Sequence, residues 1–258
     1  MRKALSIITC CLFCATISAQ ETNLMLKHGR SLLGTPYVAH TLERTAQEEL
    51  FTSRSELDCT TFVESVMAMS LATKEDGTFS EEDFARQLEK IRYRGGVLDG
   101  YTSRLHYVAD WINDNTKEGI IEDITAVHSQ DKDILQLSFM STHPDSYKHL
   151  KNNPENIARI VATEKKLSGQ EVHWIPKQKL PNEGLPWIKN GDIVMLATNI
   201  SGLDVSHMGI AIYQNGKLHL LHASSVEKKV VIDKRTLHNQ LAESKRITGI
   251  RVVRAVLK

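Results

Sequence analysis

Apolar and polar positions follow two different patterns along the chain. In roughly the first two thirds, apolar residues recur at steps of three and four, which is the spacing of one face of a helix. This pattern predicts helices over residues 23–33, 60–71, 80–91, 104–113, 147–151 and 154–168. Nearer the C-terminus, short apolar runs bounded by turn residues predict about five strands instead. They cover residues 193–196, 207–213, 218–223, 229–232 and 247–256.

Helices followed by antiparallel strands are typical of an α+β fold. The chain has 258 residues, of which 41% are apolar and 24% charged, as in an ordinary globular domain. Its net charge is +1 and it has no basic stripe with interleaved aromatic residues, so we expect no nucleic-acid partner. No internal segment approaches the roughly 20 apolar residues that cross a bilayer. We therefore expect no transmembrane segment in the mature chain.

The N-terminus has the composition of a secretory signal peptide. Arg2 and Lys3 precede an apolar run over residues 4–17, and small residues follow, ending at Ala19. We expect cleavage after Ala19, which leaves residues 20–258 as a single domain. A buried N-terminal helix is one alternative. A lipoprotein signal is another, because Cys10, Cys11 and Cys14 lie in the run, but none has the preceding residues that lipidation needs.

Removal of this segment would leave Cys59 as the only cysteine. A lone thiol in an exported protein makes no internal disulfide, so it is either buried or kept for its reactivity. Cys59 precedes the helix predicted from Thr60, with Asp58 as a suitable N-cap. The positive end of a helix favours the thiolate, and its free N–H groups can hold an oxyanion. Cys59 is therefore the candidate nucleophile, with a buried core cysteine as the alternative.

A thiol nucleophile needs a general base, and the chain has eleven histidines. His207 opens a predicted strand, and Asn215-Gly216 is the turn signal that follows it. A two-residue turn there would place His222, on the returning strand, on the same face as His207 and one diagonal step away. His219 would lie on the opposite face. We therefore assign His207 as the base and His222 as the residue that orients it, although a structural sheet histidine remains an alternative for His222.

Five motifs, taken in order, resemble the signatures of NlpC-type cysteine peptidases, which are papain-like enzymes of the bacterial cell wall. They are Leu33-Gly34-Thr35-Pro36-Tyr37-Val38, Leu57-Asp58-Cys59-Thr60-Thr61-Phe62-Val63, Gly191-Asp192-Ile193-Val194, His207-Met208-Gly209-Ile210 and His222-Ala223-Ser224. The resemblance implies a papain-like core and a triad of Cys59, His207 and His222. It also implies that Tyr37 lines the site and helps to hold the oxyanion, and that Asp58 contacts substrate. Capping of the helix remains an equal alternative for Asp58.

The spacing differs from the usual NlpC pattern, because 148 residues separate Cys59 from His207. We expect a mainly helical insertion over roughly residues 75–185. Within it, residues 103–111 resemble the N-acetylmuramoyl-L-alanine amidase-like branch. That resemblance implies cleavage between the lactyl group of N-acetylmuramic acid and L-Ala in small wall fragments. Arg104 could then grip a carboxylate, and Tyr107 or Trp111 could stack on a sugar; a solvated arginine and core aromatics are the alternatives.

These observations predict an exported, periplasmic cysteine amidase that acts on peptidoglycan fragments. The expected catalytic residues are Cys59, His207 and His222; the expected oxyanion and substrate contacts are Tyr37, Asp58, Thr60 and Arg104. We expect no cofactor and no metal, because the chain has neither His-Glu-x-x-His nor paired cysteines in its mature part. Three alternatives stay open: a D-Glu–diamino acid endopeptidase, a non-catalytic wall-binding module, and an acyltransferase or lipid-modifying enzyme.

Overall fold

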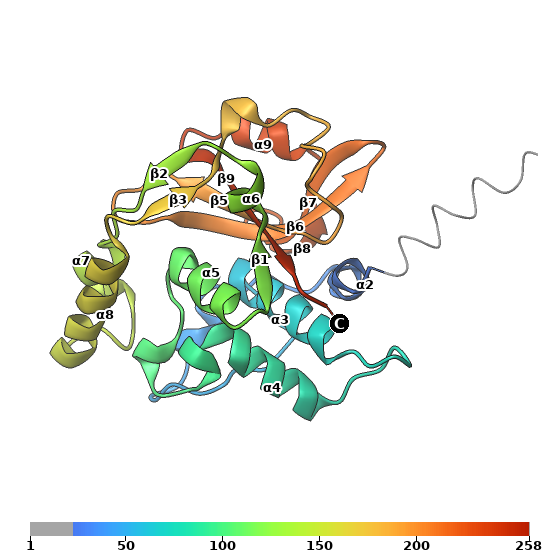
Figure 1. The fold of residues 1–258 in the computed structure, drawn as a ribbon. Helices are drawn as coiled ribbons and strands as arrows, with labels where there is room; N and C mark the ends of the chain where they lie inside the picture. The colour runs from blue at the N-terminus through green and yellow to red at the C-terminus, as the bar shows by residue number, and fades with distance from the viewer. Residues whose placement is uncertain (1–22, 258) are drawn as a thin grey trace, which may run out of the picture.

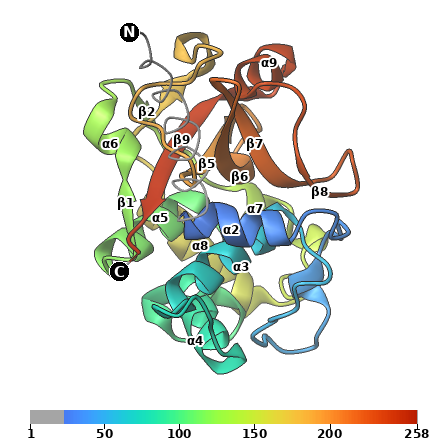
Figure 2. The same cartoon turned by 90° about the vertical axis from the view of Figure 1, so that its right-hand side faces the viewer.

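The computed structural model describes residues 23–257, so the predicted signal peptide lies outside the described residues. An antiparallel sheet separates a layer that contains α2 to α5 from α6 and α9, which pack on its other face (Figures 1 and 2). The helices are α2 (Leu24–Ser31), α3 (Cys59–Ala72), α4 (Glu81–Arg92), α5 (Val108–Lys117), α6 (Ile124–His128), α7 (Phe139–Thr142), α8 (Pro154–Leu167) and α9 (Leu237–Glu243). No helix in this part of the chain is long and apolar enough to cross a membrane.

The sheet contains more strands than the sequence pattern predicts. The strands are β1 (Ile121–Asp123), β2 (Lys132–Ile134), β3 (Glu171–His173), β4 (Ile175–Pro176), β5 (Ile193–Thr198), β6 (Val205–Gln214), β7 (Lys217–Ser224), β8 (Lys229–Ile232) and β9 (Ile247–Ala255). The five predicted strands are β5 to β9. They form a seven-stranded sheet with β1 and β4, in the order β1-β9-β5-β6-β7-β8 with β4 also on β9, while β2 and β3 pair separately.

The prediction of about five strands and a mainly helical insertion was therefore incomplete. The expected insertion contributes α4 to α8, but also the four short strands β1 to β4. Strands of two or three residues are too short to show an alternating pattern, and their pairing with β9 or with each other depends on distant parts of the chain.

Helix α3 begins where the sequence predicts. The Asp58 carboxylate accepts the backbone N–H of Thr61 at 2.8 Å, and the Thr61 hydroxyl accepts the backbone N–H of Asp58 at 2.9 Å. This reciprocal cap satisfies two donors that a helix start otherwise leaves free. The apolar face of α3, including Phe62 and Val66, packs in one core cluster with Met208 of β6. The cap and the packing together fix Cys59, the first residue of α3, over the sheet.

The turn between β6 and β7 confirms the predicted hairpin. Asn215 and Gly216 both have positive φ angles, of 51° and 74°, as a two-residue turn of this kind requires. The register runs from Gln214 opposite Lys217 to Ile210 opposite Leu221, where the pairing of β6 with β7 ends. The backbone of β6 before Ile210 is thus free of its neighbour on that side.

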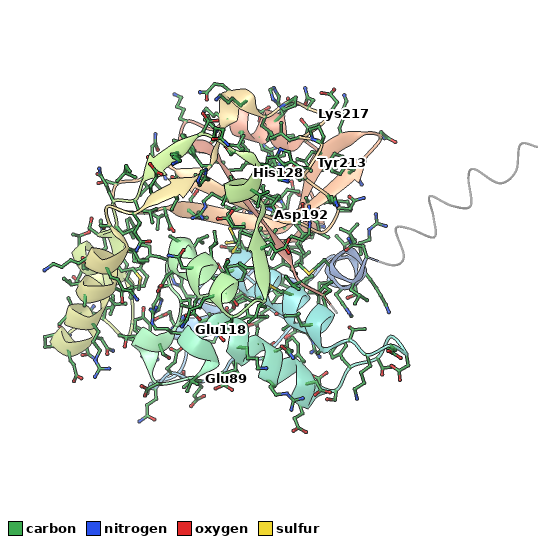
Figure 3. The ribbon with its side chains drawn as sticks, viewed as in Figure 1. Glu89, Glu118, His128, Asp192, Tyr213 and Lys217 are labelled. Carbon is green, nitrogen blue, oxygen red and sulfur yellow. The ribbon has the colours of Figure 1, made fainter. Side chains whose placement is uncertain are left out.

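Asp192 of the Gly191-Asp192-Ile193-Val194 motif has a structural role that the sequence did not specify. Asp192, labelled in Figure 3, precedes β5 and accepts two hydrogen bonds from the Arg254 guanidinium, at 2.7 and 2.8 Å. This ion pair, buried on the Asp192 side and partly exposed on the Arg254 side, ties the start of β5 to β9. The helix predicted over residues 104–113 instead covers Val108–Lys117, because Arg104 is extended and pairs with Tyr93. Residues 147–151 form turns rather than a helix.

Candidate active site

Cys59 is placed at the positive end of α3, against the open edge of β6. Its sulfur accepts a hydrogen bond from the backbone N–H of Met208, the residue after His207. That N–H is available because the pairing between β6 and β7 stops at Ile210. The fold therefore brings the predicted nucleophile beside the start of the strand that carries the predicted base.

His207 and His222 form a direct pair, as predicted from the hairpin register. Nε2 of His207 lies 2.6 Å from Nδ1 of His222, and the two rings meet edge to face at 85°. Gly209 makes this approach possible, because a Cβ there would come within 2.9 Å of the His222 Cβ. His219 lies opposite Ile212, and its Nδ1 bonds to the Asp233 carbonyl oxygen instead. The expected separation of the two histidine faces is confirmed.

Asp233 is a site residue that the sequence reasoning missed. It follows β8 directly, and its Oδ2 lies 3.8 Å from Nε2 of His222. Burial opposes ionisation of this carboxyl group, but hydrogen bonds from Arg235 lower its pKa below the usual value. In the sequence, Asp233 is an acidic residue directly after the strand that follows His222. That position suggests a partner for His222 only once β8 is known to pair with β7.

Burial decides the protonation of the Cys59 and His207 pair. It raises the pKa of the Cys59 thiol to about 11, helped by the nearby Asp58 carboxylate and only partly offset by the hydrogen bonds from Met208 and Thr60. It also lowers the pKa of His207 well below 6.5, helped by His222. Both shifts run against the expected thiolate and favour a neutral thiol and a neutral imidazole in the free site, because the desolvation of Cys59 opposes the effect of the helix end.

A cavity of about 360 Å³ opens beside Cys59. It brings together all four residues predicted to bind the oxyanion or substrate, which are Tyr37, Asp58, Thr60 and Arg104. Tyr37 is held by a hydrogen bond from its backbone N–H to the Lys228 carbonyl and by its bridge to Leu57. Burial and the neighbouring Cys59 raise the pKa of Tyr37 to about 12, so its hydroxyl remains a donor. Neither His207 nor His222 lines this cavity.

Arg104 already has partners in this cavity. Its guanidinium bonds to Glu48 at 2.8 Å and to Glu43 at 3.0 Å, and the residue is only 8% exposed. Asp58 likewise uses one carboxylate oxygen to cap α3. The capping alternative for Asp58 is thus observed, and a substrate contact by either residue remains a prediction.

The core alternative holds for Tyr107 and Trp111, and the sugar-stacking role raised for them is contradicted by their burial. Tyr107 is 2% exposed and donates its hydroxyl to Glu164 at 2.6 Å. Trp111 is 3% exposed and belongs to the core cluster under α3. Because α5 starts at Val108, both rings face the interior, which is the ordinary place for aromatics of an amphipathic helix.

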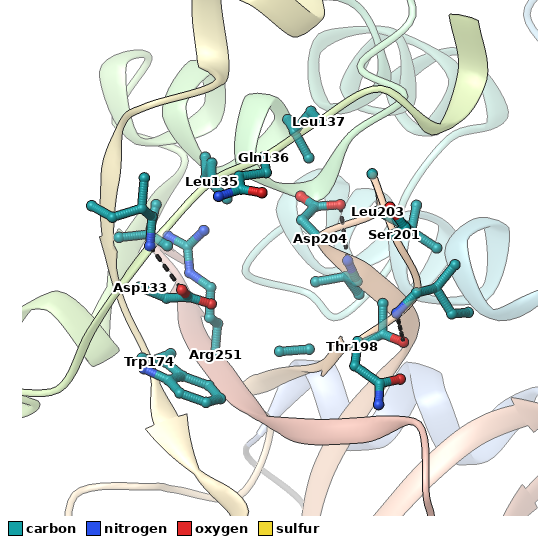
Figure 4. Close-up of a pocket in the computed structure, with 17 residues that line it drawn as sticks. Asp133, Leu135, Gln136, Leu137, Trp174, Thr198, Ser201, Leu203, Asp204 and Arg251 are labelled. Carbon is teal, nitrogen blue, oxygen red and sulfur yellow. Dashed lines mark hydrogen bonds between the residues drawn. The ribbon is translucent and has the colours of Figure 1, made fainter. Parts of the chain in front are cut away.

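A second cavity, of about 330 Å³, lies between β2 and β3 and the loop before β6 (Figure 4). It shares no lining residue with the cavity beside Cys59. Two of its charged groups, Arg251 and Asp204, join the inserted segment to the sheet. Arg251 bonds to Asp123 at 2.9 Å, and Asp204 accepts the backbone N–H of Ala109 at 2.7 Å.

Comparisons with known proteins identify a family for this chain. A family model described as N-acetylmuramoyl-L-alanine amidase-like matches residues 27–250. A solved N-acetylmuramoyl-L-alanine amidase from Bacteroides uniformis is 53% identical, with a TM-score of 0.88 over 90% of this chain and 98% of that one. A Bacteroides fragilis protein named as a candidate xylanase is 57% identical, with a TM-score of 0.86 over 89% of this chain and 100% of that one.

A more distant protein, from Legionella pneumophila, has the same fold. It is 24% identical and gives a TM-score of 0.68 over 95% of this chain and 92% of its own. None of the curated proteins matches the chain.

Proposed function

Because the chain belongs to the N-acetylmuramoyl-L-alanine amidase-like family, we propose that it hydrolyses the amide between N-acetylmuramic acid and L-Ala of small peptidoglycan fragments, with Cys59 as the nucleophile. The observation that carries this proposal is the placement of Cys59 against Met208, next to a His207–His222 pair joined at 2.6 Å. A cysteine, a base and a residue that orients the base are the components of covalent amide hydrolysis.

The reaction begins from the neutral pair. The Cys59 sulfur attacks the amide carbonyl carbon, a C–S bond forms, and the thiol proton passes to His207. The backbone N–H of Cys59 and the Tyr37 hydroxyl stabilise the oxyanion. His207 then returns the proton to the nitrogen of L-Ala, the C–N bond breaks, and the peptide leaves. Water, deprotonated by His207, hydrolyses the thioester and restores the thiol.

The order of the elements supports a papain-like, NlpC-type core. Cys59 is the first residue of α3, His207 lies near the start of β6, and His222 lies on the adjacent strand β7. A D-Glu–diamino acid endopeptidase would use the same catalytic residues. The family assignment favours the amidase, and the position of the cut in a defined substrate separates the two.

The name of the Bacteroides fragilis protein raises a glycosidase as a second possibility. Most glycosidases need two carboxyl groups on either side of the sugar bond. The cavity beside Cys59 has three, but each has another partner: Asp58 caps α3, Glu43 pairs with Arg104, and Glu64 pairs with Arg92 at 2.7 Å. These contacts favour the thiol as the reactive group.

Mass spectrometry of defined disaccharide–peptide fragments tests the proposal. The wild-type protein should release an intact peptide with a free L-Ala amine, together with a disaccharide that carries a lactyl carboxylate. Cys59→Ala should release neither, and Cys59→Ser, which keeps a hydroxyl of similar size, should be strongly impaired. A cut after D-Glu would replace the amidase by the endopeptidase. Equal turnover by Cys59→Ala, or release of reducing sugar from xylan, would contradict the cysteine mechanism.

We also propose that the enzyme acts after export, in the periplasm. The support is the sequence pattern of residues 1–19. N-terminal sequencing of the protein from a periplasmic fraction should begin at Gln20. Recovery of a chain that retains Arg2 and Lys3 in the cytoplasm would contradict this location.

A further inference from the structure

The outer nitrogen of His222 is the unexplained group of the active site. Nδ1 of His222 bonds to His207, whereas Nε2 is buried and has no hydrogen-bond partner. His222 as a whole is 5% exposed, so water cannot readily satisfy this nitrogen. The Asp233 carboxylate is the acidic group that faces it, with Oδ2 at 3.8 Å. A movement of about 1 Å would bring the two atoms within hydrogen-bond distance.

We propose that Asp233 is a positioning residue of the active site, which accepts the Nε2–H of His222 and so fixes the proton positions of both histidines. The inference rests on the proposed function, because it assigns to His207 the role of base toward Cys59. It extends the catalytic chain by one member, from Cys59 through His207 and His222 to Asp233.

Neutral imidazole carries its proton on one nitrogen only, so the tautomer of His222 sets the tautomer of the hydrogen-bonded His207. If His222 is protonated on Nε2, toward Asp233, its Nδ1 is an acceptor. His207 must then donate from Nε2, and its Nδ1 keeps the lone pair that can take the Cys59 proton. The atom that acts as base is therefore Nδ1 of His207.

The opposite arrangement is unproductive. If His222 donated from Nδ1 to His207, its Nε2 lone pair would face the Asp233 carboxylate, and two acceptors would oppose each other. His207 would then carry its proton on Nδ1 and could not accept another from the thiol. The negative charge of Asp233 selects the first arrangement, in the way that the outer hydrogen bond of an imidazole sets its tautomer.

The fold holds Asp233 in place for this role. Its backbone N–H donates to the Leu220 carbonyl on β7 at 2.9 Å. Its carboxylate accepts the backbone N–H of Arg235 at 2.9 Å on Oδ1, and the Arg235 guanidinium at 2.9 Å on Oδ2. The titratable or charged groups around it are His222 and His219 from β7, with His207 of β6 behind His222, Lys234 and Arg235 from its own loop, and Glu227 and Lys229 across the adjoining pocket. Arg235 keeps the carboxylate ionised and aligned.

The proton balance is closed within this chain of residues. When Cys59 attacks, its proton moves to Nδ1 of His207, which becomes an imidazolium with N–H bonds on both nitrogens. The Asp233 charge, transmitted through His222, stabilises that cation. The same proton then passes to the leaving nitrogen of L-Ala, and both histidines return to their starting tautomers.

Two measurements on the full mature chain test the role of Asp233. In nitrogen-15 spectra of histidine-labelled protein, the wild type should show protonated Nε2 and unprotonated Nδ1 on both His207 and His222. Asp233→Asn should shift part of both signals toward the other tautomer. It should also lower kcat on the disaccharide–peptide fragment about 10- to 100-fold, with little change in KM. Removing the negative charge should move the acid limb of the rate profile to lower pH.

Asp123→Asn is the matched control, because Asp123 is similarly buried and also paired with an arginine, Arg251. It should change neither the tautomers nor the acid limb. Unaltered tautomers and an unaltered pH profile in Asp233→Asn would overturn the inference, and so would an equal effect of Asp123→Asn. The spectra need no substrate, so they decide the role of Asp233 even if the fragments are not cleaved and the proposed function itself fails.

Discussion

Gly209→Ala tests whether the contact between the two histidines is essential. A Cβ at this position would lie 2.9 Å from the His222 Cβ and 2.8 Å from the Leu220 Cγ. Carbon atoms in contact normally stand about 3.5–4.0 Å apart, so β7 must retreat by about 0.6–1.1 Å. Such a shift would stretch the 2.6 Å bond between His207 and His222 to roughly 3.2–3.7 Å, at or beyond the limit of a useful hydrogen bond.

We therefore expect Gly209→Ala to fold with a loss of about 1–3 kcal/mol, the usual effect of overpacking, and to lose activity out of proportion to that change. Since an oriented base contributes about 10²- to 10⁴-fold, kcat/KM should fall by at least 10-fold. The assay is turnover of the disaccharide–peptide fragment, with urea unfolding measured on the same samples.

Gly29→Ala is the control, because its Cβ would also meet a side chain at 2.8 Å, here the flexible tip of Leu221, which packs in the core cluster with α3 and takes no part in the His207–His222 contact. It should change stability by a comparable or smaller amount and leave kcat/KM near the wild-type value. If Gly209→Ala retains full activity, or if both variants lose it equally, the His207–His222 contact does not orient the base.

Three further predictions concern the cavity, the core and the pH. Tyr37→Phe should lower kcat about 10- to 1000-fold with little change in KM if the hydroxyl holds the oxyanion, and an effect on KM alone would refute that role. Arg92→Met leaves Glu64 buried without its partner at 2.7 Å, so chemical unfolding should show a loss of about 3–5 kcal/mol, and a change below about 1 kcal/mol would contradict it. Because burial lowers the pKa of His207 and His222 below 6.5, the unfolded chain binds more protons as the pH falls through 6.5. The unfolding free energy should therefore decrease as the pH decreases from 6.5, by up to about 1.4 kcal/mol per pH unit for each histidine. Unfolding curves that coincide at pH 7 and pH 5 would exclude this linkage.

Local chemistry made the central part of the site predictable from the sequence. The Asp58 cap, the Asn215-Gly216 turn and the two-residue period of a strand each depend on neighbouring residues only, and together they place Cys59, His207 and His222. The same reasoning could not place the short strands β1 and β4, because nothing in two or three residues records the partner strand β9.

Burial is the property that local patterns describe least well. Arg104 and Trp111 have sequence contexts that suit a substrate contact, yet one is paired with two glutamates and the other lies in the core. Asp233 was missed because local patterns do not show which strands become neighbours. Its importance depends on β8 lying beside β7, which is a feature of the assembled sheet.

Burial also favours the neutral forms of Cys59 and His207, the proposed catalytic pair. The helix end and the Met208 N–H favour a thiolate, but desolvation raises the pKa of the Cys59 thiol and favours its protonated form. The thiolate is the form that oxidants attack, so a protonated thiol is protected in an oxidising compartment such as the periplasm, where the enzyme is proposed to act. The groups that stabilise the anion become effective when a bound amide carbonyl accepts the electrons of the sulfur and the proton moves to His207. Reactivity would then be coupled to the presence of substrate, and if the chain is exported as proposed, the single cysteine of its mature part would be both reactive and durable.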